Sequence, residues 1–322
     1  MRYVVGVDIG ATKTRVGLFK LDGELLKVVT ATTPQEGSDE VVAHTVISQI
    51  FKLVSDPYRE IAAIGVGTVG PIDIRRGDVV GAPNVRLKTF RLKAPIEEVM
   101  RVKTYVVNDC VAAVWGEYIV GAGRGFSNVV YVTLSTGIGC GVVVDDHLLL
   151  GKDGNAHEVG HVVIDCSGRF VCGCGSIGHW EGIASGANIP RTAATLAREW
   201  GGPDTEAYRK ALEGSMTSEE LFQYRSRSDV FADYLVNFLA EINAAGVASV
   251  VNIYDPEILS LGGSIALRNP GFIEVIARKT PKYTVNRMPK IVLTPLGENA
   301  VLIGAAAIAL NTPLNLVKLQ GS

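Results

Sequence analysis

The sequence predicts an α/β protein built from two related lobes. Three observations support this prediction. Runs of β-branched residues alternate with helical patterns, which is typical of α/β chains. A strand–glycine turn–strand pattern that opens the chain recurs 124 residues later, as when Thr12 falls on Thr136. The length of 322 residues, 47% of them hydrophobic, suits two cores better than one.

The opening segment predicts a hairpin and a third strand. Apolar strand patterns cover residues 3–8, 14–20 and 25–29, and turn residues separate them at Gly10-Ala11-Thr12 and Asp22-Gly23. The second copy of this pattern covers residues 129–134, 140–144 and 148–150. The repeat therefore predicts that each lobe opens with a hairpin whose tight loop presents backbone N–H groups.

The hydrophobic period of the sequence and its helix-capping residues predict the other elements. We expect strands over residues 61–66, 104–107, 257–261 and 291–294, and helices over 183–200, 229–253 and 298–310. Thr217, with Glu220 three residues later, predicts a capped helix start. The repeat places a small lobe at residues 1–108, completed by 298–322, and a larger lobe at 109–297.

Charge and composition exclude several classes of function. The 31 basic and 33 acidic residues leave a net charge of −2, so the sequence predicts neither a nucleic-acid nor a membrane partner. Asp8 interrupts the first apolar run before it reaches the length of an export signal, and residues 300–310 are too few to span a bilayer. The odd count of five cysteines favours reduced thiols, and we expect a cytoplasmic protein.

Two glycine loops are candidate phosphate sites. In the first loop, a carboxylate at a strand end precedes a turn with a hydroxyl and an ammonium, which suits a phosphate and its Mg²⁺; its residues are Asp8, Gly10, Ala11, Thr12 and Lys13. The alternative interpretation is a plain hairpin turn. The second loop, at residues 135–141, includes Thr136 and Gly137 and allows the backbone to approach an anion.

Asn108 and Asp109 follow a β-branched strand and open a helix. Taken alone, Asp109 is a helix N-cap. If the strand ends at a cleft, the same carboxylate can accept a hydroxyl proton as phosphoryl transfer begins, and Asn108 then orients a sugar.

A cluster of histidines and cysteines predicts a structural zinc site. The four candidate ligands complete a tetrahedral set and leave no open position for catalysis; they are His161, Cys172, Cys174 and His179. The alternative is a metal-free glycine loop with buried cysteines. His157 is a less favoured ligand, and we expect Cys110, Cys140 and Cys166 to be small buried side chains.

These motifs resemble the ROK family of sugar kinases over essentially the whole chain. The phosphate motif of that family is similar to Asp8–Lys13, with Ala11 in place of its second glycine, a change we expect to be tolerated unless the position needs a positive φ. Its Glu-x-Gly-His motif matches Glu158–His161. Its cysteine-rich zinc motif matches Cys172–Glu181, except that His179 replaces the last cysteine.

The resemblance implies the actin-like ATPase (ribonuclease H-like) fold, with two lobes around a cleft. It also implies that Asp109 is the catalytic base and that the first loop binds ATP phosphates. Residues implied to bind the sugar are Asn84, Asn108, Glu158, His161 and Glu181, with Gly70 in a sugar-side glycine loop. Gly263 is implied to pack near adenosine, and the zinc to hold the sugar loop.

The favoured hypothesis is an ATP-dependent hexokinase or glucokinase that phosphorylates the 6-hydroxyl of a hexose and uses ATP, Mg²⁺ and structural Zn²⁺. A kinase of N-acetylmannosamine or N-acetylglucosamine is the alternative. A sugar-responsive regulator of the same family is less favoured, because no segment for a DNA-binding helix-turn-helix precedes Asp8. We also expect a homo-oligomer, a dimer or larger.

Overall fold

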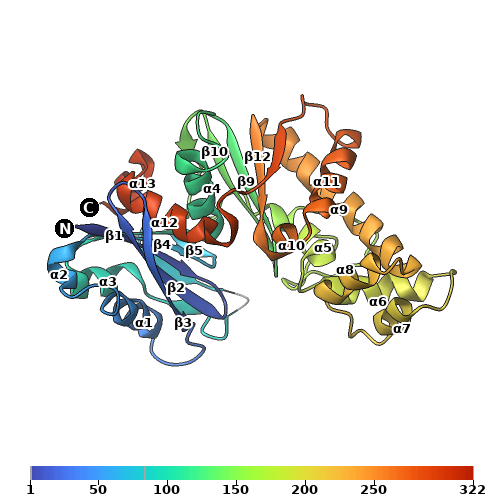
Figure 1. Ribbon diagram of the computed structural model, residues 1–322, viewed down its shortest axis with the longest axis horizontal. Helices are drawn as coiled ribbons and strands as arrows, with labels where there is room; N and C mark the ends of the chain where they lie inside the picture. The colour runs from blue at the N-terminus through green and yellow to red at the C-terminus, as the bar shows by residue number, and fades with distance from the viewer. Residues whose placement is uncertain (1, 83–84, 322) are drawn as a thin grey trace. The chain divides into compact units, whose positions relative to one another are not determined.

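A computed structural model describes residues 2–82 and 85–321, and the chain forms two compact units (Figure 1). The first unit comprises Met1–Tyr131, Gly141–His157 and Thr294–Ser322. The second comprises Val132–Cys140 and Glu158–Leu293. This division differs from the sequence-based boundary after residue 108, because the helix that follows that residue packs within the first unit.

The first unit is built on a five-stranded sheet of order β3-β2-β1-β4-β8. Strands β1, β4 and β8 are parallel, and β1, β2 and β3 form an antiparallel meander. The strands are β1 (Tyr3–Ile9), β2 (Lys13–Lys20), β3 (Leu25–Thr32), β4 (Ile61–Thr68) and β8 (Lys103–Asn108). All five lie where β-branched runs predict them, except that β3 and β4 run further.

Helices α12 and α4 pack together, and α12 lies against β1 and β4, while α1 and α3 pack on each other (Figure 1). The helices of this unit are α1 (Val41–Ile50), α2 (Pro57–Glu60), α3 (Lys93–Met100), α4 (Asp109–Val120), α12 (Ala300–Leu310) and α13 (Leu314–Gln320), with the 3₁₀ turn η3 (Gly297–Asn299).

Glycines bring α12 unusually close to its neighbours. A Cβ on Gly65 of β4 would lie 1.8 Å from the carbonyl oxygen of Ala305, and a Cβ on Gly304 would lie 1.8 Å from that of Ala112. Backbone therefore contacts backbone on both sides of α12. This contact holds α4 in the first unit.

The second five-stranded sheet has the order β11-β10-β9-β12-β13, with β12 and β13 parallel. Its strands are β9 (Val129–Leu134), β10 (Ile138–Val144), β11 (His147–Leu148), β12 (Ile258–Gly262) and β13 (Lys290–Leu293). Strand for strand this order matches that of the first sheet, with β9 and β10 in the places of β1 and β2. The repeat predicted from the sequence is thus confirmed by the topology.

The second unit carries most of the later helices. They are α5 (Trp180–Ala184), α6 (Ile189–Glu199), α7 (Glu206–Leu212), α8 (Ser218–Ser226), α9 (Val230–Tyr254), α10 (Gly263–Arg268) and α11 (Pro270–Lys279), with 3₁₀ turns η1 (Val159–His161) and η2 (Thr280–Lys282). The predicted capping box of Thr217 and Glu220 is present at the start of α8. The single helix predicted over residues 183–200 is wrong, because the chain breaks between α5 and α6.

A third, small sheet of order β5-β6-β7 was not predicted. Its strands are β5 (Ile72–Asp73), β6 (Asp78–Val80) and β7 (Thr89–Phe90). Strands of two or three residues are too short to show a hydrophobic period.

Helix α9 is long and apolar enough to cross a membrane by length and composition alone, and 61% of its most apolar window is buried in the structure. A second candidate is the bent pair of Gly297–Leu310 and Leu314–Gln320. Because α9 packs against α5, α8 and α11, its apolar character is accounted for as the core helix of the second unit.

One buried hydroxyl in the first sheet offers a test of the packing. Thr68 is fully buried, and its Oγ1 has no hydrogen-bond partner among the described residues. An unpaired buried hydroxyl destabilises a fold, so Thr68→Val should raise the free energy of unfolding by about 1 kcal/mol in chemical denaturation. The matched control is Thr14→Val, which should lower it, because Thr14 Oγ1 bonds Thr33 Oγ1 at 2.9 Å. Equal losses in both variants would contradict the prediction.

Candidate functional site

The first set of candidate residues lies at the carboxyl ends of parallel strands in the first unit. The strand register pairs Asp8 of β1 with Gly67 of β4, and Thr68 of β4 with Asn108 of β8. Three neighbouring strands therefore end at one edge of the sheet, where ligands bind in open α/β sheets. Asp109 lies close enough there for its charge to raise the pKa of Asp8.

The first glycine loop is a tight turn between β1 and β2. Gly10 N–H donates to the carbonyl of Lys13 at 2.9 Å, and the Thr33 hydroxyl donates to the carbonyl of Gly10 at 2.8 Å. Ala11 is not among the residues of positive φ, so its methyl group is accommodated, as expected. The side chains of Thr12 and Lys13 remain exposed and available to a ligand.

Asn108, and not Asp109, is the N-cap of α4. The Asn108 Oδ1 accepts the N–H of Cys110 at 2.9 Å, and Asp109 is the first helical residue. Asp109 Oδ1 accepts the same N–H at 2.8 Å. Asn108 therefore supplies the N-cap that the sequence alone assigned to Asp109, and Asp109 shares the same N–H from the first helical position.

Burial controls the charge of both carboxylates. Burial, followed by the Asp109 charge, raises the pKa of Asp8 to about 7, although Arg15 opposes the shift with Nη1 3.9 Å from Asp8 Oδ2. Burial likewise raises the pKa of Asp109. Paired carboxylates with raised pKa values are typical of sites that take up protons or cations.

The raised pKa of Asp8 predicts a pH-dependent gain of stability on its removal. Without Mg²⁺, the ionised carboxylate destabilises the folded state, and this penalty grows as pH rises from about 3.8 to about 7. Asp8→Asn should therefore stabilise the metal-free protein by a few kcal/mol at pH 8, on the order set by such a shift, and little near pH 4. Thermal unfolding at both pH values in EDTA measures this difference. A gain independent of pH would contradict it.

Two residues near this edge were missed in the sequence. Asn155 holds the loop after β4, because its Oδ1 accepts the N–H of Ile72 at 2.8 Å and its Nδ2 donates to the carbonyl of the same residue at 2.7 Å. Arg15 is the second missed residue, and no spacing in the sequence marked either Asn155 or Arg15.

Gly70 lies close to Asn108. A Cβ on Gly70 would lie 3.2 Å from Asn108 Nδ2, so the missing side chain leaves room for the Asn108 amide. Asn84 lies outside the described residues.

The second glycine loop, between β9 and β10, lies in the second unit. Ser135 N–H donates to the carbonyl of Gly137 at 3.0 Å, which closes the turn, and Thr136 at its tip is exposed. Gly263 packs below it with φ +85°, and a Cβ there would lie 2.5 Å from the carbonyl oxygen of Leu134. Only glycine fits this position.

Three of the residues implied to hold a sugar, Glu158, His161 and Glu181, lie in the same unit as this loop. Glu158 precedes η1, and its Oε2 lies 4.0 Å from His161 Nε2. Glu181 Oε2 accepts the N–H of Ile138 at 2.9 Å. Glu158, His161, Glu181, Thr136, Gly137 and Gly263 thus belong to one unit, whereas Asp8, Gly70, Asn108 and Asp109 belong to the other.

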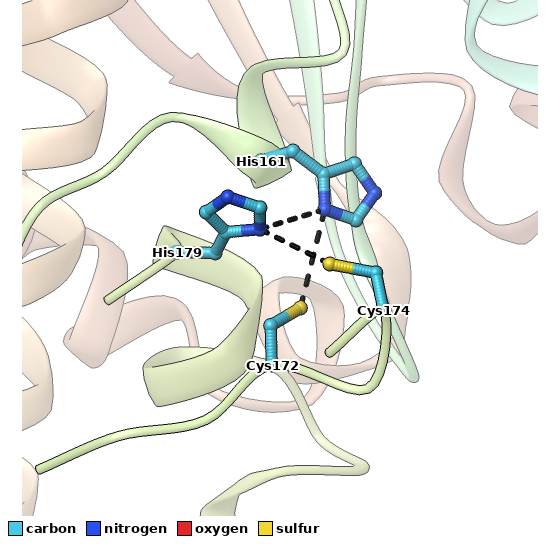
Figure 2. A group of neighbouring side chains, drawn as sticks. All are labelled: His161, Cys172, Cys174 and His179. Atoms are coloured by element: carbon cyan, nitrogen blue, oxygen red, sulfur yellow. Dashed lines mark hydrogen bonds between the residues drawn. The ribbon is translucent and has the colours of Figure 1, made fainter. Parts of the chain in front are cut away.

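Four side chains converge on one point in the second unit, as Figure 2 shows. The four predicted ligands His161, Cys172, Cys174 and His179 offer donor atoms that all lie within 4.8 Å of one another. Gly178 allows the turn that brings them together, because a Cβ there would lie 1.6 Å from the carbonyl oxygen of Asp165. His157 lies outside the group and contacts the carbonyl of Leu149 instead.

The donor set fits a tetrahedral zinc ion. The two Nδ1 atoms lie 3.2 Å apart, Cys174 Sγ lies 3.3 Å from His179 Nδ1, and Cys172 Sγ lies 3.9 Å from His161 Nδ1 (Figure 2). Ligands of a tetrahedral zinc with two nitrogens and two sulfurs are separated by roughly 3.3–3.8 Å. A backbone hydrogen bond from Ser176 lowers the pKa of Cys174, which favours the thiolate that binds metal.

The remaining cysteines are only partly as predicted. None of the five cysteines forms a disulfide, and Cys110 and Cys140 are buried as expected. The prediction of a buried Cys166 is wrong, because this residue lies exposed in the turn where Ser167 N–H donates to Asp165 Oδ1.

The ROK family matches residues 4–312. The chain belongs to the ROK family. Among ROK relatives, the glucokinase of Aeropyrum pernix is 39% identical over 323 residues, which cover 98% of this chain and 99% of that protein.

Two ROK crystal structures are also similar. The hexokinase of Thermus thermophilus has a TM-score of 0.80 and 34% identity, over 95% of this chain and 97% of that one. The glucokinase of Streptomyces griseus, in complex with glucose and AMPPNP, has a TM-score of 0.79 and 29% identity, over 95% and 99%. The predicted α/β class and actin-like ATPase fold are therefore confirmed.

Proposed function

We propose that this ROK protein is an ATP-dependent hexose kinase that phosphorylates the 6-hydroxyl of glucose and related hexoses. The observation that carries the proposal is the half-buried pair of Asp8 and Asp109 carboxylates at the sheet edge of a chain similar to glucokinases over its full length. Phosphoryl transfer needs one group to accept the hydroxyl proton and another to hold the metal of the nucleotide. The pair supplies both.

Asp109 is the general base in this proposal. Its carboxylate accepts the proton of the 6-hydroxyl as the sugar oxygen bonds to the γ-phosphorus, and the bond from that phosphorus to ADP breaks. The residues proposed to hold the sugar hydroxyls are Asn84, Asn108, Glu158, His161 and Glu181, with Gly70 in the sugar-side glycine loop. The place of Asp109 supports this role, because it opens α4 at the sheet edge that also carries Asp8, while Asn108 supplies the N-cap of the helix.

Two loops are proposed to bind the phosphates of ATP. The first is the turn from Gly10 to Lys13, and the second is the turn at Thr136 and Gly137. Magnesium bound with the nucleotide neutralises phosphate charge, and Asp8 is the carboxylate of this chain proposed to hold it.

A pocket beside the second loop supports nucleoside binding. It is lined by Phe222, Ser264 and Arg268 among others, and Ser264 Oγ lies 3.1 Å from Ser135 Oγ. Ser264 follows Gly263, the residue implied to pack near adenosine. An aromatic ring and polar groups next to a phosphate loop suit the base and ribose of ATP.

Zinc is proposed as a structural ion held by His161, Cys172, Cys174 and His179. Zinc fixes the segment that carries Glu181, and it leaves no open ligand position for water. The free thiols support a reducing, cytoplasmic compartment. We further propose a homo-oligomer, which light scattering of the purified protein tests.

The experiment for this function measures ADP release from Mg-ATP with glucose, fructose, mannose, N-acetylglucosamine or N-acetylmannosamine, and without sugar. We expect release with the plain hexoses. Release only with an acetylated sugar would reassign the protein to amino-sugar phosphorylation, and no sugar-dependent release would refute the proposal.

A further inference from the structure

The second glycine loop is fastened to the segment that joins α5 and α6. Gly186 N–H donates to the carbonyl of Ser135 at 2.8 Å, and Ala187 N–H donates to that of Thr136 at 3.1 Å. These two bonds hold one side of the turn. The other side, where β10 begins, is held by Glu181 Oε2, which accepts the N–H of Ile138 at 2.9 Å.

The carboxylate of Glu181 fills a space that only glycines leave open. A Cβ on Gly137 would lie 2.7 Å from Glu181 Oε2. A Cβ on Gly160 would lie 2.2 Å from the carbonyl oxygen of Ile138 and 3.4 Å from the Cβ of Glu181. The turn, the Glu158–His161 segment and Glu181 are therefore in direct contact within one unit.

Glu181 is itself rigidly placed. The preceding Trp180 is fully buried, and its Nε1 donates to Asn243 Oδ1 at 3.0 Å. Its ring lies against Gly246 of α9, where a Cβ would lie 2.3 Å from ring atoms. His179, on the other side of Trp180, belongs to the proposed zinc site. Because the backbone of Glu181 is anchored in this way, its side chain also fixes the position of the backbone group that it hydrogen-bonds.

The two oxygens of Glu181 have different surroundings. Oε2 is committed to Ile138, whereas Oε1 accepts no hydrogen bond from the part of the chain that the structure describes. One oxygen is thus available to a sugar hydroxyl while the other holds the turn. A charged acceptor on a backbone N–H makes a strong bond of this kind.

We propose that Glu181 is a positioning residue for the phosphate loop at Ser135–Gly137, in addition to its proposed contact with the sugar. The inference rests on the proposed function, in which this loop binds the phosphates of ATP. It requires that Glu181 set nucleotide affinity even when no sugar is bound.

The test measures binding of Mg-ADP and Mg-AMPPNP by calorimetry in the absence of sugar. Glu181→Ala should weaken nucleotide binding about tenfold, because the bond to Ile138 is lost. Glu181→Gln should stay within about twofold of the wild type, because its amide oxygen still accepts that N–H. Both variants should bind glucose more weakly.

Three outcomes are informative. Unchanged nucleotide affinity in Glu181→Ala overturns the inference and leaves the proposed function intact. Equal losses in the alanine and glutamine variants also overturn it, because the glutamine preserves the hydrogen bond. A wild-type protein that binds no nucleotide refutes the proposed function itself.

A second variant keeps the inference testable if Glu181→Ala fails to fold. Gly137→Ala directs a methyl group at Glu181 Oε2 and should weaken nucleotide binding in the wild-type background. In the Glu181→Ala background the same change should cost less, since the clash is gone. Strictly additive losses contradict the inference. Glu199→Ala, which removes an exposed carboxylate on α6, is the matched control and should leave binding unchanged.

Discussion

Asp109→Asn should lower kcat for hexose phosphorylation by about 10³-fold, the range expected when a general base is removed. The asparagine Oδ1 still accepts the Cys110 N–H, so the helix start and the backbone remain in place. The amide cannot take the proton of the 6-hydroxyl. Affinities for glucose and Mg-ADP should therefore change by no more than a few fold, which places the loss in the chemical step.

Steady-state kinetics and calorimetry on the same preparation test this prediction. The matched control is Asp233→Asn, which changes an exposed aspartate in the first turn of another helix, α9, and should leave kcat unaltered. Near-normal turnover of Asp109→Asn would exclude Asp109 as the base. A loss of glucose affinity as large as the loss of kcat would instead indicate a binding role.

Loss of the zinc site should have the second largest effect. Cys172→Ser removes a buried ligand, so the purified variant should lack the zinc ion that we expect in each wild-type chain. Without the ion, the chain from His161 to Glu181 loses its common anchor. The apparent melting temperature should fall by roughly 5–10 °C, and glucose affinity should fall with it.

Elemental analysis, thermal unfolding and glucose titration measure these effects. His179→Cys is the matched control, because it introduces the cysteine found at this position in the zinc motif that the sequence resembles, and it should keep the ion. Full stability and sugar affinity in a zinc-free wild-type protein would contradict a structural role for the metal.

The sequence predicted the parts of the fold that depend on local patterns. The strands of both hairpins and helix α12 lie close to where β-branched runs and helical period placed them. The four ligand candidates were found because cysteine and histidine at short spacing have few other purposes. Their convergence required only one tight turn at Gly178.

The features that were missed depend on contacts between distant segments. The break between α5 and α6 arises because Gly186 and Ala187 donate their N–H groups to the loop at Ser135 and Thr136, about fifty residues earlier in the chain. Asn155 acts on Ile72 in the same way. The hydrophobic period of a local segment carries no information about a hydrogen-bond partner so far away in the sequence.

The backbone contact of α12 with α4 has a consequence for the order of folding during synthesis. Helix α4, which carries the proposed base Asp109, packs on residues that leave the ribosome after the whole second unit, because Thr294–Ser322 completes the first unit. By the time Leu293 is made, every residue of the second unit is already present. We therefore expect a chain stalled on the ribosome before α12 to contain every residue proposed to bind zinc, but to lack the backbone contact that holds the proposed base Asp109 in the first unit.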